Sequence, residues 1–392
     1  MSPPIIPFKE TITFASKQEK SKNEEKQAQA TFEQKHQEQL SPTTAQKEQN
    51  FTVGPDGRVE IQSGDKRITM CVRAKSLPDG VTKFLESNVQ YIKLLNKFNQ
   101  NKISTDLQDT LKLLSEFKAD LIKEFEKSTK DVSDKQDWQN VANNILAFGP
   151  NRFGPNILVN KVDNVRSVWS ILDGANAQEK SNRVSALKEY ENNILFGFNL
   201  IASKGPICEE PMQGVCFFIE KFQEDQSRAK EEAGLEKELE KLDLAEDEEA
   251  DKTEKKFKMQ SVTSQCISLT KEACRRAFEA QPQRLMAAMY KCEILTVNSE
   301  ALGKLYAVLG KRNAKIIDES IKDSTNMFCI TSYLPVADSF GLAEEIRKRT
   351  SGLATPHIEF SHFEIIDIDP YWEPKTEEEL EAYGKKIFFL VK

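Results

Sequence analysis

Histidine is scarce in this 392-residue chain, which contains three, and its seven cysteines include no Cys-x-x-Cys pair. Zinc sites are mostly built from paired cysteines, alone or with histidines, so this sequence argues against a zinc centre. Two histidines, His357 and His362, lie five positions apart on an expected strand, which places their side chains on opposite faces. Scattered thiols of this kind are typical of a reducing compartment.

The sequence also lacks a phosphate-binding loop of the form Gly-x-x-x-x-Gly-Lys-Ser/Thr. Gly149 and Gly154 have the required spacing, but Pro155 stands where the lysine is needed. The stretch Asn160-Lys161-Val162-Asp163 fits the guanine-reading pattern of GTPases, yet so short a match arises by chance and has no phosphate loop to accompany it. The two Gly-Pro pairs here predict a rigid loop that leads into a strand.

No apolar run reaches the roughly 20 residues that a membrane-spanning helix needs, and prolines interrupt the start where a secretory signal would lie. We therefore expect a cytoplasmic protein. The net charge is −7, and residues 223–256, with 14 acidic and 7 basic side chains, account for all of it. Because the rest is neutral overall, this acidity does not exclude a nucleic-acid partner, which local basic patches could bind.

Residues 285–371 alternate short strands with two amphipathic helices. We expect, in order, a strand around residues 290–294, a helix over 302–309, strands over 315–321 and 328–334, a helix from Ser339 to Gly352 and a strand over 358–366. The second helix should bury Phe340, Ala343 and Ile346. The order β-α-β-β-α-β is that of a ferredoxin-like fold, which covers one sheet face with two helices and leaves the other open for a partner.

The preceding residues 51–282 predict an α/β domain with long insertions, which makes the whole chain α+β. We expect a hairpin over 51–61 and 66–74, an αα-hairpin with apolar faces at 85–95 and 107–125, a third helix near 137–148, a strand over 156–162, a helix over 179–203, a strand over 214–222 and a helix from 263 to 282. Residues 15–50 are rich in Glu, Gln and Lys and predict a disordered insert. Residues 223–256 predict a short exposed helix with a flexible acidic segment.

Residues 5–14 predict a strand without a neighbour in sequence. Two interpretations stand about equally: it is the last piece of a preceding domain, with residues 1–14 as its remnant, or it pairs with a distant strand.

No residue of the chain is predicted to be catalytic or to bind a metal or a cofactor. Five basic residues are candidates for RNA or ribosome contact: Lys311, Arg312, Arg347, Lys348 and Arg349. The last three lie near the C-terminus of an expected helix, where cations are favoured by the helix dipole and are often merely solvated. The alternative is contact with phosphate groups.

Several phrases of the sequence resemble the elongation factor two and elongation factor G family of translational GTPases. The resemblance is seen in residues 148–158, 205–216 and 334–341. Residues 281–290, 345–354 and 360–366 resemble more specifically the ribosome-assembly branch of this family. The resemblance covers most of residues 51–372. It implies that residues 1–14 are the remnant of a domain III, that residues 51–282 form a domain IV-like unit with a ribosomal protein S5 domain 2-like fold, and that 285–371 form a domain V-like unit. Residues 372–392 are interpreted as a tail, which does not resemble the longer basic helical tail of the family.

The resemblance also implies a function. Such GTPases bind the maturing large ribosomal subunit and its rRNA, act with the Shwachman–Bodian–Diamond protein, and promote release of initiation factor six, an anti-association factor. GTP and magnesium would belong to a GTPase domain that this sequence does not contain. Residues 209–281 lack the histidine that the translocase carries in its fourth domain, which favours the assembly branch. The alternatives are a translocase-type elongation factor fragment or a generic RNA-binding ferredoxin-like protein.

Overall fold

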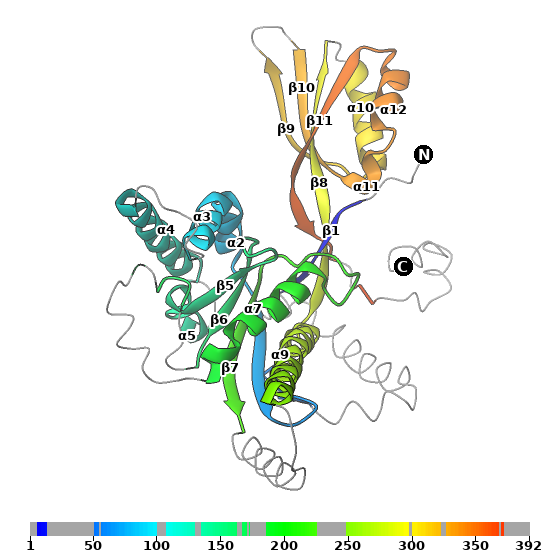
Figure 1. Cartoon of the computed structure of the whole chain (residues 1–392). Coiled ribbons are helices and arrows are strands. Elements are labelled where there is room, and N and C mark those ends of the chain that lie inside the picture. The colour runs from blue at the N-terminus through cyan, green and yellow to red at the C-terminus, as the bar shows by residue number, and fades with distance from the viewer. Residues whose placement is uncertain are drawn as a thin grey trace, which may run out of the picture. The chain divides into compact units, whose positions relative to one another are not determined.

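The computed structural model describes residues 6–13, 51–54, 56–99, 107–129, 135–162, 167–170, 172, 186–225, 248–297, 300–322, 327–367 and 370–371. The chain divides into two compact units, each containing sheet and helix (Figure 1). Met1–Glu10 and Arg284–Lys392 form what we call the C-terminal unit, and Thr11–Gln283 form the central unit. The predicted insert 15–50, most of the acidic insert 223–256 and the tail 372–392 lie outside the described residues.

The C-terminal unit contains a five-stranded sheet with the order β1-β8-β10-β9 and β11 paired to β8. Its strands are β1 (Phe8–Ile12), β8 (Gln283–Thr296), β9 (Lys315–Lys322), β10 (Met327–Pro335) and β11 (Ala354–Ile365). The N-terminal strand therefore does pair with a distant strand, because β1 lies beside β8. From β8 onward the elements follow the predicted β-α-β-β-α-β order.

Helices α10 (Glu300–Lys311) and α12 (Leu342–Thr350) cover one face of this sheet (Figure 1). Their apolar sides meet Ile294 and Ile330 in a single core. The prediction for the second helix was wrong at its start. Val336–Ser339 forms a separate turn, α11, and Phe340 is 47% exposed rather than buried. Gly341, with φ of +74°, separates the two helices in a conformation that glycine adopts readily.

The central unit contains a six-stranded sheet with the order β2-β3-β4-β7-β6-β5. The strands are β2 (Phe51–Val53), β3 (Arg58–Gln62), β4 (Ile68–Ser76), β5 (Ile145–Gly149), β6 (Asn156–Asn160) and β7 (Val215–Glu224). All neighbours are antiparallel except β6 and β7, which run parallel. The predicted hairpin is confirmed as β3 and β4, with Val59 opposite Val72.

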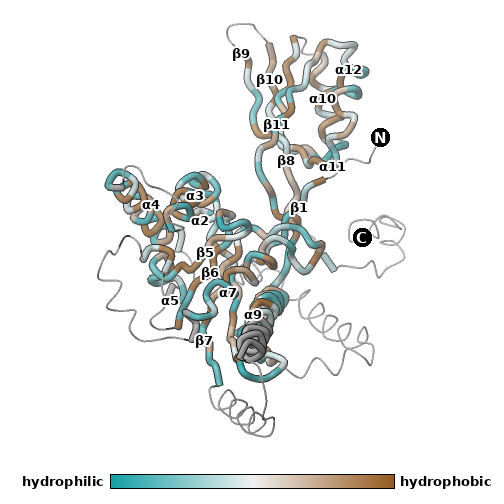
Figure 2. Tube along the Cα trace, in the orientation of Figure 1, coloured by the Kyte–Doolittle hydropathy of each residue, from teal (hydrophilic) through white to brown (hydrophobic). Residues whose placement is uncertain are grey.

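Two apolar layers cover the two faces of this sheet. Two neighbouring residues of β7 belong to different layers, because successive side chains of a strand point to opposite faces of the sheet. Phe217 packs with α7 (Ala186–Ser203) and the C-terminal part of α9 (Glu248–Glu279), and Phe218 packs with the helices on the other face. Those helices are α2 (Asp79–Ser87), α3 (Val89–Asn99) and α4 (Leu107–Ser128). Figure 2 shows the apolar residues concentrated along the strands and on the inner sides of the helices.

The prediction of a third helix over residues 137–148 was wrong. The structure has a single turn, α5 (Lys135–Trp138), a 3-10 turn, η3 (Val141–Asn144), and then strand β5, whose residues are all buried. A short apolar run such as Ile145-Leu-Ala-Phe148 fits a fully buried strand as well as a buried helix, and pairing with β6 decides the matter here. Helix α9 also starts earlier than expected, at Glu248, in a stretch rich in the helix-favouring residues Glu and Lys.

No helix among the described residues has the length and apolar character needed to cross a membrane.

Candidate functional site

The structure brings together three of the five predicted basic residues, Lys311, Arg312 and Arg349, around Glu345 of α12. Arg347, Lys348 and Arg349 occupy the last turn of α12 and are exposed. Lys311 ends α10, and Arg312 follows it. Glu345 Oε2 accepts hydrogen bonds from Arg312 Nε (3.0 Å) and Nη2 (2.8 Å), while Lys311 and Arg349 lie 3.9 and 3.6 Å from its Oε1.

Arg312 has a structural role that its sequence position did not reveal. Its side chain is 18% exposed, and its Nη1 also donates to the backbone oxygens of Asp338 and Phe340. It therefore ties the end of α10 to the turn between α11 and α12. The hydrogen bonds from Arg312 are the main cause that lowers the pKa of Glu345 below its ordinary value. Arg347 and Lys348 are the members of the predicted set best placed for contact with a partner, because neither belongs to this arrangement around Glu345.

The open face of the same sheet carries mixed charge. Lys291 pairs with Glu293 at 2.7 Å, and the ring of Tyr333 lies edge-on to that of His362 at 4.8 Å. His357 is opposite Glu293 in the register, so it shares this face with Tyr333. The expectation that the two histidines lie on opposite faces was therefore wrong, because a register shift between Phe360 and His362 turns the strand. Their register positions still differ by four residues, or about 13 Å.

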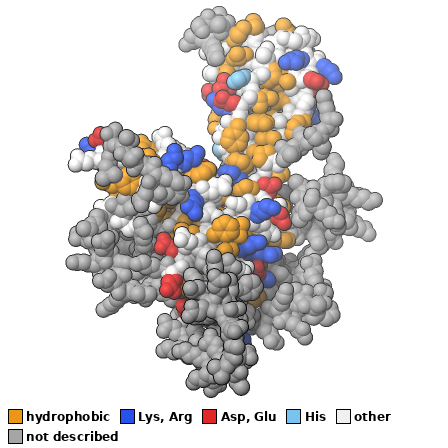
Figure 3. Space-filling model, in the orientation of Figure 1, with side chains coloured by type: hydrophobic (Ala, Val, Ile, Leu, Met, Phe, Trp, Pro, Cys, Tyr) orange, Lys and Arg blue, Asp and Glu red, His pale blue; other side chains and the backbone are white. Residues whose placement is uncertain are grey.

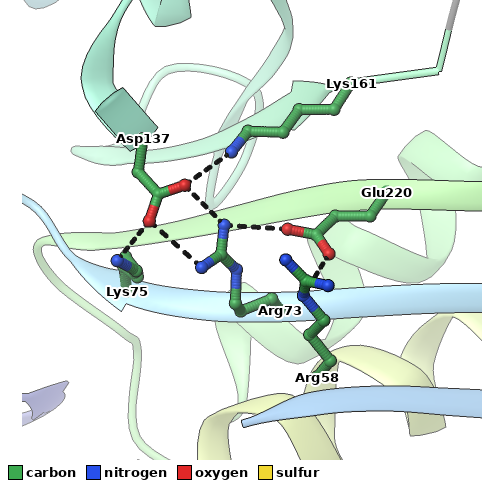
Figure 4. Close-up of polar contacts among 6 residues, drawn as sticks. All are labelled: Arg58, Arg73, Lys75, Asp137, Lys161 and Glu220. Atoms are coloured by element: carbon green, nitrogen blue, oxygen red, sulfur yellow. Dashed lines mark hydrogen bonds and ion pairs between the residues drawn. The ribbon is translucent and has the colours of Figure 1, made fainter. Parts of the chain in front are cut away.

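Sequence reasoning missed the largest charge cluster among the described residues, which lies on the central unit (Figure 4). Its six members are Arg58, Arg73, Lys75, Asp137, Lys161 and Glu220. We call it the Asp137 network. Strands β3, β4 and β7 supply Arg58, Arg73, Lys75 and Glu220, which are brought together because these strands are neighbours in the sheet.

Asp137 is the centre of the network. Its carboxylate accepts two hydrogen bonds from Arg73, at 2.8 and 3.1 Å, one from Lys75 at 2.5 Å and one from Lys161 at 3.0 Å. Burial alone would raise the pKa of Asp137, but these hydrogen bonds outweigh it and hold the pKa well below the usual value for an aspartate. The carboxylate is therefore ionised at any physiological pH.

Glu220 continues the network along the sheet. It accepts from Arg73 at 2.8 Å and from Arg58 at 2.8 Å, so Arg73 lies between two carboxylates with only 7% of its side chain exposed. The ring of Phe218 lies below the cations, 4.4 Å from Lys161 Nζ and 5.6 Å from the Arg73 guanidinium carbon. Such cation–aromatic contacts add to the stability of partly buried cations.

The chemistry of the network is electrostatic. It contains no hydroxyl or thiol nucleophile beside a base, and among the described residues no cluster of His, Cys, Asp and Glu could hold a metal ion. It joins the short helix α5 to the sheet, because Asp137 lies on α5 and its partners lie on β4 and just after β6. Arg73 and Lys75 are two positions apart on β4, which puts them on one face, but the predicted strand ended at residue 74, and Asp137 lies far away in sequence.

Each of the two units contains a segment that matches a known protein family. The model of the family "Elongation factor-like GTPase 1-like domain" matches residues 73–161, a segment that contains Asp137 and its three cationic partners, and the model "Elongation factor G C-terminus" matches residues 284–373. Elongation factor-like GTPase 1 of Homo sapiens is 38% identical over 411 residues, which cover 98% of this chain and 35% of that protein.

Ribosome assembly protein 1 of Saccharomyces cerevisiae is 33% identical, over 88% of this chain and 28% of that protein. The protein of the same name from Schizosaccharomyces pombe is 38% identical, over 65% of this chain and 23% of its own length. The chain thus spans about a third or less of the length of these relatives. With both family models and all of these relatives in agreement, the chain belongs to the elongation factor-like GTPase and ribosome assembly family within the elongation factor G group, and it corresponds to the C-terminal part of such a protein.

Proposed function

We propose that this chain is the ribosome-binding part of a translational-type GTPase that acts in late cytoplasmic maturation of the large ribosomal subunit. The observation that carries the proposal is the alignment of 98% of the chain with a relative named as an elongation factor-like GTPase. Support also comes from the names of the fungal relatives, which are ribosome assembly proteins. In this proposal the chain binds the large ribosomal subunit. A domain outside this sequence binds GTP with magnesium and hydrolyses the GTP.

The proposed contact on the C-terminal unit is the end of α12. Arg347 and Lys348 are exposed there beside Arg349, which is 50% exposed. Adjacent cations of this kind suit contact with phosphate oxygens of rRNA, which fix orientation without reading sequence. We propose that the subunit-bound chain acts together with the Shwachman–Bodian–Diamond protein and contributes to the release of initiation factor six.

Cosedimentation with purified large subunits tests the proposal. The chain should pellet with subunits at about 50 mM salt and progressively less at about 200 mM, because phosphate contacts release counterions. The double variant Arg347→Ala/Lys348→Ala should bind more weakly and reduce the slope of log affinity against log salt by about 2. The matched control is Lys123→Ala/Lys127→Ala, which removes two exposed cations from α4 of the central unit.

A chain that fails to pellet with subunits even at the lower salt would overturn the proposal. Equal binding by wild type and the Arg347→Ala/Lys348→Ala variant, at every salt concentration, would retain subunit binding but overturn the role of α12. The isolated chain should hydrolyse no GTP above background, with or without subunits. GTP turnover by a preparation free of contaminating GTPases would contradict the proposal that hydrolysis belongs to a domain outside this sequence.

A further inference from the structure

The loop between β5 and β6 holds an exposed arginine in an unusual backbone conformation. Asn151 and Arg152 have φ of +55° and +70°, so two consecutive residues other than glycine adopt the left-handed region. This region is uncommon for residues with side chains, and a long side chain such as arginine is rarely chosen for it. The surrounding structure must therefore stabilise the conformation.

Two helices hold this loop from opposite sides. Asn199 on α7 accepts a hydrogen bond at 3.2 Å from the backbone N–H of Arg152, and Asn96 on α3 donates to the backbone oxygen of Arg152 at 2.5 Å. Within the loop, the N–H of Gly154 donates to the oxygen of Pro150 at 3.0 Å. The backbone is thus fixed while the side chain of Arg152 remains exposed.

Apolar side chains lie exposed next to this loop. Phe196 is 54% exposed and Leu200 is 40% exposed, one helical turn apart on α7. Asn199, which holds the loop, is one residue before Leu200 and three after Phe196, so all three lie on one side of the helix. Figure 3 shows hydrophobic atoms with Lys or Arg side chains beside them on this unit, over the α7 ribbon.

Basic side chains complete the surface. Lys93 Nζ lies 4.4 Å from the ring centre of Phe153 in the loop, and Lys97 is exposed one turn further along α3. Lys204, just after α7, is 70% exposed and pairs with Glu209 at 3.3 Å. Cations interleaved with accessible aromatic rings are the combination that single-stranded nucleic acids require, because phosphates need charge and unpaired bases need flat apolar partners.

We propose that this surface, formed by Lys93, Arg152, Phe153, Phe196 and Leu200, binds unpaired RNA. A base stacks on the exposed ring of Phe196, and Arg152 and Lys93 bind the flanking phosphates. The rigid loop fixes Arg152 before the ligand arrives, which lowers the entropy lost on binding. The inference goes beyond the proposed function, because it concerns a different unit and a naked RNA tests it without any ribosomal subunit.

Two substitutions separate binding from folding. Arg152→Gly removes the side chain and suits the left-handed backbone, and Phe196→Ala replaces an exposed ring by the residue with the highest helix propensity. Both variants should therefore stay folded, as circular dichroism would show. The matched controls are Lys66→Gly, which removes an exposed cation at φ of +60°, and Phe340→Ala, which removes a ring that is 47% exposed on the C-terminal unit.

Binding is measured with the full chain and a fluorescein-labelled single-stranded RNA of about 12 nucleotides, a length within the usual site size. By fluorescence anisotropy in low salt, Arg152→Gly and Phe196→Ala should each weaken binding about five-fold or more, and the controls should stay within about two-fold. A duplex of the same sequence should compete poorly, since its bases are not free to stack.

Three outcomes would overturn the inference. They are no measurable RNA binding by wild type, wild-type affinity in both Arg152→Gly and Phe196→Ala, or competition by the duplex as strong as by the unlabelled single strand. The first of these would direct the search to a protein partner for the exposed side chains of Phe196 and Leu200 on α7. Because the probe is a naked oligonucleotide, failure here leaves the subunit-binding proposal untouched, and failure of cosedimentation leaves this result standing.

Discussion

Replacing Asp137 by asparagine should destabilise the central unit while leaving its shape unchanged. Asparagine has nearly the same size, so the substitution removes the negative charge from beneath Arg73, Lys75 and Lys161 without creating a cavity. The four hydrogen bonds that now reach a carboxylate would have to reach a neutral amide, which accepts through one oxygen and presents its NH₂ group to the cations.

The structure sets the size of the effect. Removing one partner of a fully buried ion pair costs about 3–5 kcal/mol, because the other charge stays buried. Here Lys75 and Lys161 keep 19% and 30% of their side-chain surface in water and can be solvated again. Arg73, at 7%, cannot, but it keeps Glu220 at 2.8 Å. We therefore expect a loss of about 2 kcal/mol in the free energy of unfolding at neutral pH, below the range for full burial.

The effect should depend on pH in one direction. The folded-state pKa of Asp137 lies below its ordinary value of 3.8, so its contribution is fully present above that value and is lost as pH falls toward the folded-state pKa. The stability difference between wild type and Asp137→Asn should therefore be constant from about pH 5 to pH 8 and smaller at about pH 3.

Urea unfolding followed by tryptophan fluorescence is the suitable assay. Trp138 and Trp169 are both buried in the core beside α4, at 5% and 0% exposure, and Trp138 contacts Phe218 beneath the network. The control is Asp120→Asn, which breaks an exposed pair with Lys123 and should change stability by less than about 0.5 kcal/mol. If Asp137→Asn were as stable as this control at pH 7, the network would not contribute to stability and the reasoning would be refuted.

Three further predictions follow from the described contacts. Arg312→Ala should speed amide hydrogen exchange in the turn between α11 and α12, whereas Lys311→Ala, which removes a side chain that is 70% exposed, should not; equal effects would deny Arg312 its structural role. Gly197→Ala should cost about 1–3 kcal/mol in urea unfolding, because a Cβ there would lie 2.8 Å from Thr270 Cβ on α9, and an unchanged midpoint would contradict that packing. Ellman's reagent should label Cys208 at least ten-fold faster than the other thiols, all of which are buried, so Cys208→Ser should abolish the fast phase.

The C-terminal unit shows what periodicity can predict. Alternation in β8 and the i, i+3, i+4 spacing of α10 placed Cys292, Ile294, Leu305 and Leu309 in one core, where the structure has them. Phe340 escaped the same reasoning because a left-handed glycine follows it and divides the helix. Periodicity records which side of an element is apolar, but it does not record a break that depends on one backbone angle.

The central unit shows where such reasoning stops. Arg73 and Asp137 are separated by 64 positions, and no local pattern connects them. Lys161 drew attention in the sequence through a chance likeness to a GTPase motif, whereas in the structure its ammonium group binds Asp137 and covers the ring of Phe218. Each of these side chains alone is an ordinary surface charge. They become a network because β4, β7 and β6 are neighbours in one sheet, and the local sequence pattern contains no information about that neighbourhood.

The loop between β5 and β6 was likewise only partly predictable from the sequence. Its glycines and prolines predicted a rigid loop. Because Pro155 replaces the lysine that a phosphate-binding loop needs, the sequence indicated no function for it. Glycine at position 152 would adopt the observed φ of +70° without steric cost. The chain instead places an arginine there, in a conformation that costs on the order of 1 kcal/mol relative to glycine, and exposes it beside Phe196. A stability gain for Arg152→Gly together with a loss of RNA affinity would show that this cost is retained for binding, whereas a gain in stability without any loss of affinity would show that it is not.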